Sequence, residues 1–134
     1  GKASLEILRV KTRVEPEISD GEVLVRISIK ADTALREQTA TVNMATPEQL
    51  QLIEQRTAEH IQQEIVATFA RSVELGTDIF GFGEMMHRKY PEYWKQNEDR
   101  WDEIYPGLKM VFAITTKVRK TDMLVMPAVP TARN

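Results

Sequence analysis

The 134-residue sequence contains no cysteine, and this absence excludes disulfides, thiolate zinc sites and cysteine nucleophiles. The sequence also lacks an excess of one charge: 18 Lys and Arg stand against 20 Asp and Glu, so no basic field favours nucleic acid as a partner. Long apolar runs are missing as well, because stretches such as MVFAI, residues 110–114, are far shorter than the roughly 20 residues that span a bilayer. We therefore expect a soluble globular domain that binds no nucleic acid and does not itself cross a membrane.

Alternating apolar residues predict two strands near the start of the chain. Between residues 4 and 14, apolar residues share one side and basic residues the other, which predicts a strand with one buried face, ended by Pro16. Asp20-Gly21 has the composition of a hairpin turn. From Val23 to Asp32 the alternation continues, as in an antiparallel strand with one solvated face.

A long helix is predicted after these strands. Thr46 can act as its N-cap, Pro47 suits its first turn, and Gly76 marks its end. Apolar residues recur at spacings of three or four and form one stripe, which consists of Leu50, Ile53, Thr57, Ile61, Ile65, Phe69 and Val73. The stripe predicts a helix with one face packed on the rest of the domain.

Two shorter helices and one strand complete the pattern. Thr77 can cap a second helix that begins at Asp78, and Pro91 closes this helix and starts the third. Pro106-Gly107 ends the third helix, and the alternating residues 108–118 predict a last strand. The order strand-strand-helix-helix-helix-strand predicts an α+β fold: a small, mainly antiparallel sheet, covered on one face by the long helix and the two shorter helices.

The length suits one domain with a single core. We expect this domain to comprise residues 1–122 and to be followed by a flexible C-terminal tail, residues 123–134. The chain begins at Gly1 and shows no signal peptide, which we interpret as a domain excised from a longer protein.

Candidate catalytic and metal-binding patterns are weak. Gly81 and Gly83 could suggest a phosphate loop, but such loops follow a strand, whereas this stretch follows a helix and precedes an acidic residue. Glu84 and His87 have the Glu-x-x-His spacing of carboxylate di-iron bundles, which need a second copy and further glutamates. No serine has the context of a nucleophile. We therefore predict no catalytic residue, no metal and no cofactor, and a protein that is not an enzyme.

The stretch DIFGFG, residues 78–83, is interpreted as a packing device. Glycine inside a helix costs about 1 kcal/mol relative to alanine, so two glycines suggest that the second helix approaches a neighbouring backbone closely. Phe80 and Phe82 are expected to project in different directions. Trp94 and Trp101 are expected to share a face of the third helix and to close over the same region; the alternative for these rings is a ligand or membrane-interface face.

Three motifs carry a resemblance to a known family: Asp-x-x-Gly-Phe-Gly, then Arg-x-x-Pro-x-x-Trp, then Trp-Asp ahead of a strand. The residues that match them are Asp78, Phe80, Gly81, Phe82, Gly83, Arg88, Pro91, Trp94 and Trp101. With this spacing the chain resembles the C-terminal domain of the Ger(x)C family, the lipoprotein C subunits of bacterial spore nutrient-germinant receptors. The resemblance extends over residues 22–121, and Asp122 stands where the family commonly ends its last strand with glycine.

The resemblance implies a non-enzymatic receptor subunit that acts in nutrient-triggered germination through protein–protein contacts. The family is lipid-anchored through an N-terminal cysteine to the outer surface of the spore inner membrane, beside the integral-membrane A and B subunits. The resemblance thus implies contacts with those two subunits, attachment to the membrane only through an anchor outside these residues, and a structural role for the motif residues. The alternative function is a soluble α+β module that binds a small ligand in a cleft between helices and sheet.

Overall fold

The computed structural model describes residues 3–37 and 45–122 of the chain. The chain divides into two compact units. Of the described residues, the first unit comprises 3–11, 29–37, 45–59 and 114–122, and the second comprises Thr12–Ser28 and His60–Ala113. The predicted tail, residues 123–134, lies outside the described residues, so its flexibility and the boundary at residue 122 stay predictions.

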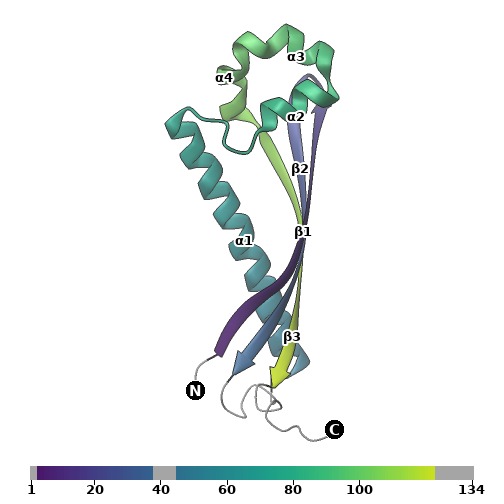
Figure 1. Ribbon diagram of the computed structural model, residues 1–134, viewed down its shortest axis with the longest axis vertical. Coiled ribbons are helices and arrows are strands. Elements are labelled where there is room, and N and C mark those ends of the chain that lie inside the picture. Colours follow the sequence, from purple (N-terminus) through teal and green to yellow (C-terminus); the bar gives the residue numbers. More distant parts are fainter. Residues whose placement is uncertain (1–2, 38–44, 123–134) are drawn as a thin grey trace, which may run out of the picture. The chain divides into compact units, whose positions relative to one another are not determined.

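Three strands form one sheet in the order β1-β2-β3 (Figure 1). β1 (Ala3–Ser19) and β2 (Glu22–Glu37) form the predicted hairpin. Asp20 and Gly21 in its turn have φ values of 51° and 77°, because a two-residue turn that matches the strand twist needs positive φ at both positions. Pro16 does not end the first strand, as the sequence predicted, but lies within it. An edge strand tolerates proline because the missing N–H can face away from the sheet.

The third strand, β3 (Lys109–Asp122), runs in the same direction as β2 (Figure 1). Lys109 pairs with Glu22 at the start of the two strands, and the Lys117 carbonyl accepts a hydrogen bond from Thr33 further along both. Parallel neighbours need a crossover connection, and the helices between β2 and β3 provide it.

The long helix α1 (Pro47–Leu75) has the predicted bounds. The Gln49 N–H donates to the Thr46 hydroxyl at 3.1 Å, and the Thr46 N–H donates to the Gln49 side-chain oxygen at 2.8 Å. These two bonds form a capping box, which satisfies donors that the first turn leaves free. Gly76 follows the last helical residue with φ 67°, the left-handed conformation that ends many helices.

The remaining helices are shorter than the sequence predicted. They are α2 (Phe82–Lys89), α3 (Pro91–Asn97), η2 (Glu98–Arg100), α4 (Trp101–Ile104) and η3 (Tyr105–Gly107). The predicted start of the second helix at Asp78, with Thr77 as its cap, is wrong, because the left-handed φ of 72° at Gly81 keeps helical geometry from extending upstream. The predicted third helix is also divided: the backbone of Asn97 (φ −123°, ψ 1°) departs from α-helical angles and is followed by a 3₁₀ turn.

In the first unit, hydrogen bonds connect α1 to β3. The Thr116 hydroxyl donates to the Glu54 carbonyl, and the Val118 N–H donates to the Glu54 carboxylate at 2.9 Å. The predicted buried face of the first strand is wrong for residues 4–13, all of which are exposed; Leu8 and Val10, for example, are 50% and 49% exposed. In this unit α1 is hydrogen-bonded to β3, while β1 lies at the other edge of the sheet.

In the second unit, helical residues and β2 share one core. Its buried apolar side chains are Val23, Val25, Ile27, Phe69, Phe82, Met86, Trp101, Tyr105 and Leu108. Phe69 belongs to the predicted α1 stripe, whose other members are half-buried. Buried residues on β2 alternate with more exposed ones, as the sequence predicted.

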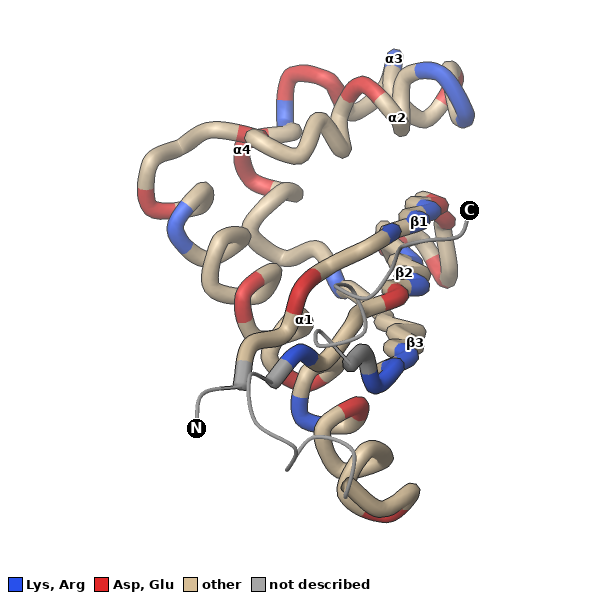
Figure 2. Tube along the Cα trace, turned by 60° about the horizontal axis from the view of Figure 1, so that its bottom comes forward, with Lys and Arg blue, Asp and Glu red and all other residues tan. Residues whose placement is uncertain are grey.

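The predicted α+β class and order of elements are confirmed. Acidic and basic residues are interspersed along strands and helices alike, in agreement with the balanced charge of the sequence (Figure 2). No helix in the described ranges 3–37 and 45–122 is both long and apolar enough to cross a membrane.

Candidate functional site

The Asp78 carboxylate is the centre of the motif region. Its Oδ1 accepts a hydrogen bond from the Phe82 N–H at 3.0 Å, and its Oδ2 accepts bonds from the Gly83 N–H at 2.7 Å and the Trp101 indole N–H at 3.1 Å. Asp78 therefore satisfies two free donors at the start of α2 and places a negative charge at the positive end of the helix dipole. It also links α2 to α4. We call Asp78, Gly83, Trp94 and Trp101 the Asp78 cluster.

Gly83 has no room for a side chain. A Cβ atom there would lie 3.0 Å from the Trp101 indole nitrogen, 3.0 Å from Trp94 Cη2 and 3.1 Å from the Asp78 carboxylate. These neighbours are side chains, whereas the sequence predicted a neighbouring backbone. Gly81 differs, since a Cβ atom at that position would meet nothing within 4 Å. The expected close approach is therefore wrong for Gly81, which instead supplies the left-handed conformation ahead of α2.

Aromatic rings pack around this cluster. Trp94 and Trp101 meet edge-on with centroids 5.3 Å apart. The expectation that they share a face of one helix is wrong, because Trp94 lies in α3 and Trp101 in α4. Trp94 is half-buried, whereas Trp101 is 8% exposed. The expectation that Phe80 and Phe82 diverge is wrong: their rings stack at 5.2 Å, since the left-handed residue between them turns the chain.

Two other motif residues, Arg88 and Pro91, make none of the hydrogen bonds of the Asp78 cluster. Arg88 is exposed and pairs with Glu84 at 3.5 Å, one helical turn away. Pro91 occupies the first turn of α3, where its missing N–H costs nothing. His87 stacks on Trp94 at 5.8 Å. Both residues of the Glu-x-x-His pair thus contact other side chains, Glu84 through Arg88 and His87 through Trp94. The described residues contain no group of three or more acidic or histidine side chains that could hold a metal ion.

A buried pair that carried no signal in the sequence connects α1 to this region. The Ser72 and Tyr105 hydroxyls are 2.6 Å apart, and Ser72 also donates to the Phe69 carbonyl. Burial raises the pKa of Tyr105, the hydrogen bond with Ser72 lowers it, and the charge of Asp78 raises it further. A serine in an amphipathic helix and a tyrosine 33 residues later give no local indication of such a pair.

The polar groups of the Asp78 cluster are already partnered. Three donors, all from the protein itself, surround one carboxylate. Because a carboxylate held by several hydrogen bonds is fixed in position and charge, its arrangement suits a structural joint between α2 and α4.

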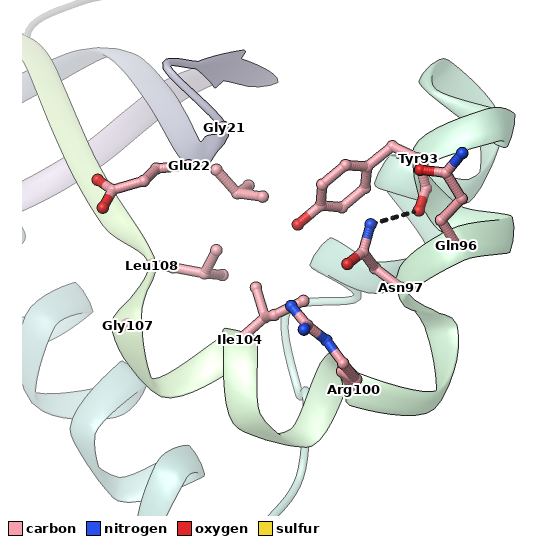
Figure 3. A pocket seen from close by; sticks show the side chains of 10 residues that line it. Gly21, Glu22, Tyr93, Gln96, Asn97, Arg100, Ile104, Gly107 and Leu108 are labelled. Carbon is pink, nitrogen blue, oxygen red and sulfur yellow. Dashed lines mark hydrogen bonds between the residues drawn. The ribbon is translucent and has the colours of Figure 1, made fainter.

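A pocket of about 420 Å³ lies elsewhere in the second unit, where the hairpin turn meets α3, η2 and α4 (Figure 3). We call it the Tyr93 pocket; Val23, Tyr93, Asn97, Arg100, Ile104 and Leu108 line it, together with four further residues. None of its polar residues was predicted from the sequence, since they come from segments that only the fold brings together.

Comparison with known proteins assigns the chain to a class of spore proteins. Residues 1–122 match the family described as "Spore germination B3/ GerAC like, C-terminal", and the chain belongs to this family. The resemblance stated from the motif residues is confirmed, and the match is wider than residues 22–121.

Individual relatives agree with this assignment. The chain is 26% identical over 121 residues to spore germination protein KC of Bacillus subtilis (strain 168), with 90% of this chain and 30% of the relative covered. It is 24% identical to spore germination protein B3 of the same strain (86% and 31% covered) and 24% identical to spore germination protein GerQC of Bacillus cereus (89% and 32%). The chain thus spans about a third of the length of these relatives.

A solved structure shows the same fold. The crystal structure of the GerBC protein aligns with a TM-score of 0.74 at 22% identity, over 87% of this chain and 36% of that chain.

Proposed function

We propose that the chain is a non-enzymatic domain of a germinant-receptor C subunit and acts in nutrient-triggered spore germination through protein–protein contacts. The observation that carries this proposal is the family match over residues 1–122. The named relatives are spore germination proteins, which supports a role in germination for this chain as well.

Two features support a non-enzymatic role. The motif carboxylate, Asp78, is occupied by three donors that belong to the protein itself. The relatives bear names of germination proteins and none bears the name of an enzyme. A motif region with this arrangement would hold the short helices together, and receptor contacts would then lie on exposed surfaces.

The proposal extends to the longer protein that contains this domain. A lipid anchor outside these residues would hold it at the outer surface of the spore inner membrane, and the integral-membrane A and B subunits would be its partners. Membership of the family of spore germination proteins supports such partners. The apolar runs of this chain are too short to span a bilayer, which supports an anchor located outside these residues.

Affinity purification of the tagged longer protein from detergent-solubilised spore membranes tests this. We expect two integral-membrane subunits to co-purify, and we expect a version without residues 1–122 to reach the membrane but to lose partner binding or nutrient response. Substitution of the lipid-accepting cysteine should release the longer protein from the membrane fraction. Retention there without the lipid, or the absence of both subunits from the purified material, would contradict the proposal.

A further inference from the structure

The Tyr93 pocket combines an apolar wall with polar groups that have no partner among the described residues. Val23 and Leu108 are buried, and Ile104 is half-buried. In Figure 3 the side chains of Leu108 and Ile104 point toward the hollow, and the Tyr93 ring extends into it from α3. A volume of about 420 Å³ falls in the range of pockets that enclose small organic molecules.

The charged group that the pocket lining directs toward the hollow is positive. Arg100 makes no ion pair with the described residues, and Figure 3 shows its guanidinium beside Ile104, directed into the pocket. The acidic lining residue, Glu22, turns its carboxylate away from the pocket in the same view and pairs with Lys109 at 3.4 Å. An anion in the hollow would therefore meet an available cation and no opposing carboxylate.

Two further polar groups face the same space. The Tyr93 hydroxyl makes no hydrogen bond within the described residues, and in Figure 3 it points into the hollow. Burial raises the pKa of Tyr93 more than Arg100 lowers it, so the phenol is protonated at neutral pH and can donate. The Asn97 amide nitrogen donates to the Tyr93 carbonyl at 2.9 Å, which leaves the carboxamide oxygen as an acceptor.

We propose that the Tyr93 pocket binds a small organic anion, a carboxylate with an apolar body. The carboxylate would accept hydrogen bonds from the Arg100 guanidinium and the Tyr93 hydroxyl, and the apolar body would pack on Val23, Ile104 and Leu108. A guanidinium suits this ligand because its planar donors match the two carboxylate oxygens. The proposed site rests on the pocket itself and does not depend on a receptor role for the longer protein.

The test is an NMR titration of the ¹⁵N-labelled 134-residue chain with isovalerate and, separately, with isovaleramide, its uncharged counterpart. We expect saturable shifts of the backbone amides of Gly21, Asn97 and Gly107 with isovalerate and no saturable shift with the amide. Arg100→Gln should weaken isovalerate binding by about tenfold or more, as the loss of a charge-assisted hydrogen bond predicts. Tyr93→Phe should weaken it by a smaller factor.

The matched control is Lys95→Gln, which removes one positive charge from an exposed residue of α3 that does not line the pocket. It should leave the affinity unchanged, and unchanged amide shifts outside the pocket would show that Arg100→Gln is folded. The proposal is overturned if isovalerate causes no saturable shift in the wild-type chain, if isovaleramide binds equally well, or if Lys95→Gln weakens binding as much as Arg100→Gln.

Discussion

The Asp78 cluster and the Tyr93 pocket both include residues of α3 and α4, but they differ in whether their polar groups have hydrogen-bond partners. In the cluster, one carboxylate has three donors and a glycine sits where no side chain fits. In the pocket, a hydroxyl, a carboxamide oxygen and a guanidinium face a hollow without a partner among the described residues. Fully partnered polar groups fix a structure, whereas convergent unpartnered ones are typical of binding sites. Substitutions in the Asp78 cluster should therefore lower stability, whereas substitutions in the Tyr93 pocket should affect ligand binding and change stability little.

The largest loss of stability is expected from Trp101→Ala. The indole is 8% exposed, contacts Trp94 and Tyr105, and donates to Asp78. Removal of a buried tryptophan costs about 3–5 kcal/mol of unfolding free energy through the cavity that it leaves. Trp94→Ala should cost less, because that ring is half-buried. Thermal and urea unfolding of both variants measure the difference; equal losses would show that burial does not decide the effect.

Gly83→Leu should cause the next largest effect, a loss of roughly 1–3 kcal/mol of unfolding free energy, because overpacking forces neighbouring side chains out of position. Even a Cβ atom at this position would lie 3.0 Å from two tryptophans. Gly107→Ala is the matched control, since its Cβ would meet nothing within 4 Å. Unfolding midpoints that are the same for Gly83→Leu and Gly107→Ala would refute the close packing at Gly83.

Tyr105→Phe should cost about 1 kcal/mol, the typical net contribution of one hydrogen bond, because it leaves the Ser72 hydroxyl without this partner. The substitution should also alter the pH dependence of stability. Since the folded protein raises the pKa of Tyr105 above its ordinary value of 10.0, the neutral phenol contributes stability below pH 10 that is lost as the pH rises through the folded-state pKa. The stability difference between wild type and Tyr105→Phe, measured by urea unfolding from about pH 8 to 11, should shrink; a constant difference would contradict this linkage.

The smallest effect on stability is expected in the pocket. Arg100→Gln removes a guanidinium that has no ion-pair partner among the described residues, so the unfolding free energy should change by no more than about 0.5 kcal/mol. Urea unfolding beside Lys95→Gln provides the comparison. A loss as large as that of Gly83→Leu would mean that Arg100 supports the fold and that the contrast between the two regions is wrong.

The sequence predicted those features whose signals are local. The bounds of α1 followed from Thr46, Pro47 and Gly76, since capping residues act within one turn of the helix end. The hairpin followed from Asp20-Gly21 for the same reason, because a tight turn depends on the conformations that its own residues can adopt. Both signals could be interpreted without knowing what lies nearby in space.

Features that depend on distant partners were missed. The exposure of β1 depends on its place at the sheet edge, which alternation alone does not reveal. The link that Asp78 makes between α2 and α4 depends on Trp101, 23 positions later. Gly81 and Gly83 looked alike in sequence, and only the φ of the first and the neighbours of the second separate their roles. The pocket residues carried no signal because hairpin and helices converge only in the fold.

The most direct test of the structural role of the Asp78 cluster is the urea unfolding of Asp78→Ala beside Asp102→Ala, an exposed acidic residue of α4. Asp78→Ala leaves two backbone N–H groups and an indole N–H without their acceptor, so we predict a loss of about 2 kcal/mol or more. Asp102→Ala should unfold within about 0.5 kcal/mol of wild type. Wild-type stability of Asp78→Ala, together with loss of partner binding by the longer protein, would contradict the structural role and make the cluster a contact surface.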